Sequence, residues 1–175
     1  MAKATSTSIN RQKEIISAAI EVFAEMGYYR ATTAKVAERA NISQPYVFRF
    51  FATKEALLVE ALKVSFARII DSFHRIIHSA SSEQLEQELI AAYSQIMTEY
   101  RNETLLQMQA QTIREDVVVS VMQQGFREIH TTVYDAFRRA GIEQAMERTM
   151  LFLARGMLCN ISMSLDLPEL MKKDD

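Results

Sequence analysis

The scarcity of helix-breaking residues limits what this chain can fold into more than any other feature. Its 175 residues include only four glycines and two prolines. Good helix formers such as Ala, Glu, Leu, Met, Gln and Arg are abundant. No alternating apolar and polar pattern typical of half-buried strands lies between the turn signals, so the sequence predicts an all-α protein.

Charge distribution and cysteine content indicate the kind of compartment in which the protein works. The net charge is −2, but residues 1–60 carry +8 and −6, or +2, so the N-terminal end is the more positive one. Cys159 is the only cysteine, which suits a reducing compartment. The sequence shows no signal peptide and no run of roughly 18 apolar residues, so we expect a cytoplasmic protein with no membrane span.

Turn and cap signals divide the first third of the chain into short helices. We expect a loose polar arm over 1–8, followed by helices over 10–26, 33–40, 44–50 and from 54 onward. Gly27 suits the left-handed residue that ends the first helix. Thr33, Ser43 and Thr53 are the predicted N-caps, and Pro45 lies in the first turn of the third helix.

The second and third of these helices, separated by the tight turn "RANIS", have the outline of a helix-turn-helix. The third helix is too short to be stable alone, so its neighbours must hold it in place. Phe23, Val36, Val47 and Phe51 are the candidates for that small core. Longer helices are predicted beyond this unit, over 54–78, 82–100, 103–113, 115–139 and 142–165, with Gly125 as a candidate break.

An exposed short helix with polar and aromatic side chains in its first turns fits the major groove of DNA. There Gln44 can read a base edge, and Tyr46 can pack against a thymine methyl group or reach a phosphate. Arg49 can bind a phosphate or pair with guanine. The stretch from Tyr46 to Phe51 holds four aromatic rings around this arginine.

Phosphate anchors are expected beside this helix. Lys54, at the start of the next helix, and the hydroxyls and amides of Thr32 and Thr33 are the candidates. The alternative interpretation is that the aromatic and apolar residues are merely core. We expect that alternative to hold for Val47 and Phe51, but not for the polar residues of the first two turns.

The ordered landmarks of this segment are typical of one protein family. They are Ile15–Ile16, Ala18–Ala19, Phe23, Gly27–Tyr28, Thr32–Thr33, Val36–Ala37, Ile42–Ser43, Phe51 and Lys54–Glu55–Ala56–Leu57. With these landmarks, the first third of the chain resembles the N-terminal domain of the TetR family of transcriptional regulators. The resemblance implies a three-helix DNA-binding domain over 9–69, with its helix-turn-helix at 32–51. A larger helical domain over 70–175 would bind a ligand and dimerise.

Carried over position by position, the resemblance implies DNA contacts at Thr33, Ser43, Gln44, Pro45, Tyr46, Phe48, Arg49 and Lys54. The sequence departs from the family pattern at Asn41, where glycine is more common, and at Pro45, where a small residue is common. Phe48 stands where the family often has a phosphate-binding tyrosine. Its ring cannot make that hydrogen bond, so Tyr46 and Arg49 are the candidates to replace it.

The second domain carries candidates for a ligand pocket. Eight of the ten methionines lie from Met97 onward, and methionine fills irregular space, although ordinary core packing explains any single one. The candidate lining residues are Phe66, Ile70, Phe73, Ile96, Met97, Tyr100, Met108, Gln111, Phe126, His130 and Tyr134. Arg114, with Gln111 and His130, could orient a polar end of a small-molecule effector.

The last two long helices are predicted to form a homodimer. The stretch "MLFLARGMLCNISMSL" has Arg155 as its only charge and is too apolar for a helix with one solvent-exposed face. Gly156 and Ser162 would permit close helix approach. A twofold dimer predicts a near-palindromic operator in double-stranded DNA, with half-sites about one helical turn apart.

Two other classes of function, an enzyme and a protein-binding adaptor, are alternatives to DNA binding. His74 and His78 share a helix face and could bind a metal, but no third ligand or catalytic motif supports an enzyme, and no cofactor is expected. A helical adaptor that binds no DNA would explain the apolar C-terminal helices, but not the exposed polar residues near Gln44. We therefore expect a dimeric repressor that a small, largely apolar effector releases from its operator.

Overall fold

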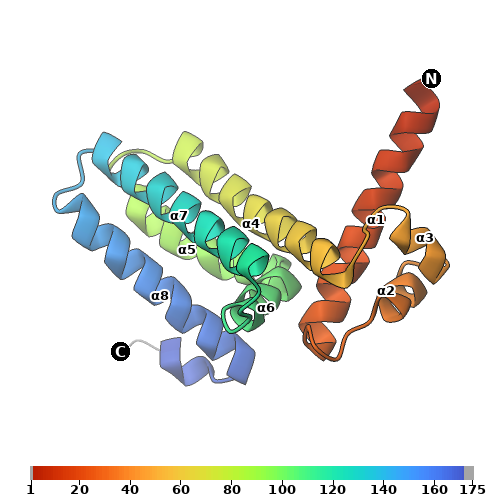
Figure 1. Cartoon of the computed structure of the whole chain (residues 1–175). Helices are drawn as coiled ribbons and strands as arrows, with labels where there is room; N and C mark the ends of the chain where they lie inside the picture. The colour runs from red at the N-terminus through yellow and green to blue at the C-terminus, as the bar shows by residue number, and fades with distance from the viewer. Residues whose placement is uncertain (1, 172–175) are drawn as a thin grey trace.

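The computed structural model describes the backbone of residues 2–171 and the side chains of residues 8–171. Within that part of the chain every regular element is helical, which confirms the all-α prediction (Figure 1). The elements are α1 (Ala2–Met26), α2 (Thr33–Arg39), α3 (Gln44–Phe48), α4 (Lys54–Ser79), α5 (Leu85–Glu99), α6 (Arg101–Ala110), α7 (Asp116–Arg139), α8 (Ala145–Leu165) and the 3-10 turn η1 (Pro168–Met171).

Helix α4 joins the two parts of the molecule. Its first turns pack on α1, and the rest of it packs on α7 and α5 (Figure 1). The helix begins where the sequence predicts, because the Thr53 hydroxyl accepts a hydrogen bond from the backbone N–H of Ala56 at 3.0 Å. Since α4 is one continuous helix, it connects α1 directly to the helices of the bundle.

A small apolar core holds α1, α2 and α3 together, as predicted. Phe23, Val36 and Val47 are fully buried, and Phe51 is nearly so. Burying such side chains stabilises a fold by about 1.5–3 kcal/mol each. These contacts hold the five-residue helix α3, which is far too short to persist alone in water.

The remaining helices form a bundle in which α7 lies between α4 and α8 (Figure 1). Phe73 of α4 packs edge-on against Phe152 of α8, with ring centroids 5.7 Å apart. Helix α7 runs through Gly125 without a break, so the expected interruption is wrong. The glycine is needed for packing, because the ring of Phe66 lies where its side chain would be.

Several predicted boundaries differ from the observed ones. Helix α1 begins at Ala2, so the expected loose arm is helical from that residue on; no glycine or proline precedes Gly27 to end the helix. Helix α3 ends at Phe48, two residues early. The N-cap of α2 is Thr32 rather than Thr33, because the Thr32 hydroxyl accepts the N–H of Lys35 at 3.2 Å.

Candidate nucleic-acid interface

Backbone conformation sets the angle between α2 and α3. Asn41 adopts a left-handed conformation with φ of 52°, which asparagine tolerates better than most residues. The N–H of Ile42 then bonds back to the carbonyl of Ala37 at 2.9 Å, which closes the turn. Ser43 occupies the N-cap position of α3 as predicted, although its side chain makes no capping hydrogen bond. Asparagine thus fills the role for which the family more often has glycine.

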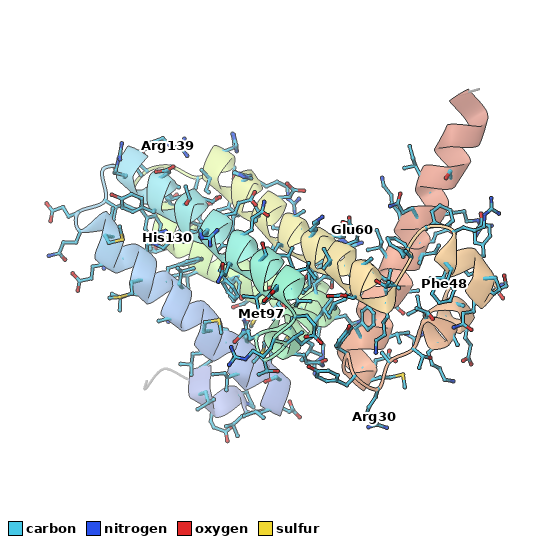
Figure 2. All side chains as sticks on the ribbon, in the orientation of Figure 1. Arg30, Phe48, Glu60, Met97, His130 and Arg139 are labelled. Atoms are coloured by element: carbon cyan, nitrogen blue, oxygen red, sulfur yellow. The ribbon has the colours of Figure 1, made fainter. Side chains whose placement is uncertain are left out.

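The outer face of α3 is formed by Gln44, Pro45, Phe48 and Arg49, all of which are exposed. These residues follow helical spacing, so their side chains lie on one side of α3. Val47, on the opposite side, is fully buried. Helix α3 lies at the end of the molecule farthest from α8 (Figure 1), and Figure 2 labels Phe48 there. This end of the molecule is open to a large partner.

Aromatic packing organises the polar groups of this face. The Arg49 guanidinium lies over the Tyr46 ring, 5.1 Å from its centroid, and the Phe50 ring meets Tyr46 edge-on at 5.4 Å. The amide of Gln44 donates a hydrogen bond to the Thr33 hydroxyl at 2.9 Å, so α2 orients the first residue of α3. The cation and the amide are therefore partly ordered before any partner binds.

Lys54 has an intramolecular role that sequence reasoning missed. Its ammonium donates to the carbonyls of Tyr28 at 2.9 Å and Ala31 at 3.1 Å, and lies 4.4 Å from the Tyr28 ring centroid. Burial, with Glu115 and Glu55 nearby, raises the pKa of Tyr28. A lysine has three N–H donors, so one remains for the phosphate contact predicted from the sequence. Only the fold brings the α1–α2 turn over Lys54.

Arg39 forms ion pairs with two glutamates of α1. Its guanidinium donates to Glu21 at 2.7 Å and to both carboxylate oxygens of Glu25, at 2.6 and 3.0 Å. Hydrogen bonding from Arg39 lowers the pKa of Glu25, and bonding from Lys35 lowers the pKa of Glu38. Arg39 therefore links α2 to α1 and is already paired, which distinguishes it from Arg49.

One hydrogen bond links α6 to the α1 end of this domain. The Gln109 amide donates to the carbonyl of Ala24 at 2.8 Å, and its amide oxygen lies 3.8 Å from the Cβ position of Gly27. That oxygen is buried without a hydrogen-bond partner in the part of the chain described.

A cavity of about 790 Å³ opens between the α6–α7 connection, α7 and α8. Apolar side chains of Ile113, Met122 and Phe126 line it, and Arg114 and Arg127 add positive charge. Of the residues predicted for a ligand pocket, this cavity includes Gln111, Phe126 and His130. A second opening of about 920 Å³ shares His130 and Leu153 with it and includes Tyr134, so the two form one groove along α7 and α8.

The other predicted pocket residues lie elsewhere. Phe66, Ile70, Phe73 and Ile96 are buried in the core, where they pack between helices instead of lining this groove. Met97 lies on α5, Tyr100 lies at the C-terminal end of α5, and Met108 lies on α6. All three are half-buried, and none of them lines the groove. Helical periodicity identified these residues as inward-facing but could not separate a filled core from a cavity.

Helix α8 presents an apolar outer face. Its exposed large hydrophobic residues are Met146, Met150, Leu151, Leu158, Ile161 and Leu165. Gly156 and Ser162, expected at a subunit contact, instead face the chain's own interior. A Cβ on Gly156 would lie 3.4 Å from Tyr93 of α5, and the Ser162 hydroxyl donates to the carbonyl of Leu167 at 2.9 Å.

The alternative sites raised by the sequence gain no support from this geometry. The ring of His78 bonds to the backbone carbonyl of His74 at 2.6 Å, which matches the capped role of such histidines. Among the described residues no group of three or more His, Cys, Asp and Glu side chains could hold a metal ion. Within the same range, no helix is long and apolar enough to cross a bilayer.

Comparison with known proteins assigns the N-terminal segment. Residues 15–61 match the family model described as bacterial regulatory proteins, tetR family. The fatty acid metabolism regulator protein of Bacillus subtilis is 33% identical over 58 residues, which cover 33% of this chain and 30% of that protein. The regulator HbdR of Aromatoleum is 32% identical over 65 residues, 37% of this chain and 27% of that protein. These matches thus span about 30% of the length of the curated relatives.

Solved structures extend the likeness to both parts of the fold. FadR from Bacillus halodurans superposes with a TM-score of 0.75 at 16% identity, covering 88% of each chain. FadR from Bacillus subtilis, solved in complex with stearoyl-CoA, gives 0.74 at 18% identity, again covering 88% of each. All the relatives named here are described as regulators, in agreement with the expectation that the chain is not an enzyme. Residues 15–61 therefore form the N-terminal domain typical of the tetR family of bacterial regulatory proteins, and the described fold as a whole is similar to that of solved regulators.

Proposed function

We propose that this protein is a ligand-responsive transcriptional regulator of the cytoplasm. It binds a near-palindromic site in double-stranded DNA as a homodimer, and it acts as a repressor. The observation that carries this proposal is the exposed outer face of α3, held by α1 and α2 within the family-matched segment. A short helix supported in this way can enter the major groove with its side chains directed at base edges.

The contacts divide into base-reading and anchoring groups. Gln44 reads a base edge, and Arg49, stacked over Tyr46, binds a phosphate or guanine. The remaining N–H of Lys54 and the exposed Thr32 hold the DNA backbone. Thr33, Ser43, Pro45 and Phe48 complete the predicted contact set. Thr33 acts through Gln44, because its hydroxyl is nearly buried and bonded to that amide.

Dimerisation through α7 and α8 accounts for the apolar outer face of α8. Met146, Met150, Leu158, Ile161 and Leu165 lie three, four or eight residues apart, so they share one side of the helix and form a stripe along it. A contiguous exposed apolar surface of this kind marks an interaction site. A second copy related by twofold symmetry would cover both stripes at once and would place two α3 helices in successive grooves.

The part of this groove beside the α6–α7 connection is the proposed effector site. Its apolar walls suit a long hydrocarbon, and the guanidinium groups of Arg114 and Arg127 suit an acidic head group. The structurally similar FadR of Bacillus subtilis was solved with stearoyl-CoA, a ligand with both properties. We therefore take a long-chain acyl thioester as the first compound to test as the small, largely apolar effector.

The effector signal would reach the DNA through α6. Ala110 and Ile113 line the cavity, and Gln109 next to them holds the carbonyl of Ala24 in α1. An effector that displaces this connection would tilt α1 and the start of α4 together, and the two α3 helices would lose their spacing. This works only if the effector binds the displaced conformation more tightly than the DNA-bound one.

The decisive experiment measures binding to labelled duplexes by fluorescence anisotropy, with a site selected from a random-sequence library. Affinity for that site should fall steeply as salt rises, because phosphate contacts release counterions. Arg49→Ala and Tyr46→Ala should abolish this binding while leaving a folded dimer. The control Lys63→Ala, which removes an exposed lysine of α4, should bind normally. Salt-independent binding, or no selected site, would refute the proposal.

A second measurement tests the effector. Stearoyl-CoA should release the labelled duplex from the wild-type protein, and Arg114→Ala with Arg127→Ala should need a higher concentration. Lys63→Ala serves again as the control for a lost positive charge. If release does not occur, or if the double variant responds as the wild type does, this groove is not the effector site.

A further inference from the structure

Phe48, the last residue of α3, is an unexpected apolar residue on the outer face of this helix. It is 45% exposed, whereas Val47 and Phe51 beside it are buried. One helical turn separates Phe48 from Gln44, so both side chains lie on the same side of α3. This apolar ring is exposed to water in the free protein. Covering it with a partner would remove apolar surface from water and would favour binding.

The chemistry of the ring limits what it can contact on DNA. A phenylalanine has no hydrogen-bond donor, so it cannot bind a phosphate oxygen or the polar edge of a base. In the major groove the one apolar group among the four bases is the C5-methyl of thymine, and Phe is among the side chains that contact it. Arg49 and Lys54, which carry N–H donors, can bind the phosphates instead.

We propose that Phe48 reads a thymine methyl group in each half-site of the operator. The inference rests on the proposed function, since it requires α3 to lie in the major groove. Tyr46 is less suited to this task, because its ring is half-buried between Phe50 and the Arg49 guanidinium. Phe48 therefore sets base preference, where a tyrosine hydroxyl at this position could instead have bound a phosphate.

The test removes the methyl group without changing base pairing. Each thymine of the selected duplex is replaced in turn by uracil, and affinity is measured with the full chain. We expect one sensitive thymine per half-site, with affinity about fourfold weaker for one substitution and about fifteenfold weaker for both, the effect of uncovering one methyl group each time. Uracil at the other thymines should change little.

Variants of Phe48 assign the effect to this residue. Phe48→Ala should bind the thymine and uracil duplexes equally, and Phe48→Leu, which keeps an apolar side chain, should still prefer thymine. Val117→Ala removes an exposed apolar side chain of α7 and should keep the wild-type discrimination. Because Phe48 is exposed, its replacement should leave the melting temperature close to that of the wild type.

The outcomes separate this inference from the function on which it rests. If the wild type binds its site but tolerates uracil everywhere, Phe48 reads no methyl group. If Phe48→Ala keeps the uracil sensitivity, another residue such as the exposed Pro45 is the reader, and the inference is again overturned. If no duplex is bound at all, DNA binding itself is refuted.

Discussion

Replacing Gly125 by alanine tests how tightly α7 packs on α4. In an isolated helix the change would favour folding by about 1 kcal/mol, because glycine is a poor helix former. In this fold the added Cβ would lie 2.4 Å from Cγ and Cδ2 of Phe66 and 2.5 Å from Cδ1. Phe66 is 3% exposed and packs edge-on against Phe126, so its ring has little room to move.

The expected result is a net loss of stability. Overpacking a core costs about 1–3 kcal/mol, and a methyl group pressed into a confined aromatic ring belongs at the upper end of that range. After subtracting the gain in helix propensity, Gly125→Ala should be about 2 kcal/mol less stable than the wild type. For a chain of this size the melting temperature should fall by roughly 4–8 °C.

Urea unfolding followed by circular dichroism measures this difference. Gly156→Ala is the matched control, because its Cβ would lie 3.4 Å from Tyr93, an ordinary contact distance, so this variant should be neutral or slightly more stable. Adding Phe66→Leu to Gly125→Ala should recover part of the lost stability by making room for the methyl group. A Gly125→Ala variant as stable as the wild type would refute this account of the α4–α7 contact.

Three further outcomes are expected. Leu158→Glu places a charge in the exposed stripe of α8, so light scattering should show a monomer, and operator affinity should be lost; a persisting dimer would contradict the proposed interface. The ion pair with Arg39 lowers the pKa of Glu25 in the folded protein below its ordinary value near 4.5. This pair therefore stabilises the fold fully above pH 4.5, and the stabilisation is lost as the pH falls through the lower pKa of the folded state. Arg39→Gln should therefore be less stable at neutral pH but approach the wild type in acid, and a constant difference would argue against it. Burial raises the pKa of Tyr93 to about 12, so Tyr93→Phe should remove an absorbance transition near that pH. The same substitution leaves the side-chain oxygen of Asn160 without its hydrogen-bond donor and should lower the free energy of unfolding by about 1 kcal/mol.

The N-terminal domain was predictable because its signals are local. The left-handed turn at Asn41 and the cap at Thr53 depend on residues only a few positions away. The buried positions of Val36 and Val47 follow from helical spacing together with the ordered landmarks of the family. Where the prediction missed by one residue, at the N-cap of α2, two adjacent threonines offered the same hydroxyl. The structure decided between them by burying Thr33 against Gln44.

The second domain was predictable in class but not in detail. Periodicity placed Phe66 and Phe126 on inner faces, and both do face neighbouring helices. It could not indicate that Phe66 fills the space beside Gly125 while Phe126 borders a cavity. A cavity is a property of several helices at once, and small differences in their packing decide where it opens.

The sequence by itself determined that the chain is helical, where its short helices turn, and which residues can form the outer face of α3. These properties depend on backbone preferences and on spacing along one helix. Only the tertiary structure decided that Lys54 binds the carbonyls of Tyr28 and Ala31 and that Gln109 binds Ala24. Those contacts join groups 23 to 85 residues apart, and no local pattern records which distant groups the packed helices bring together.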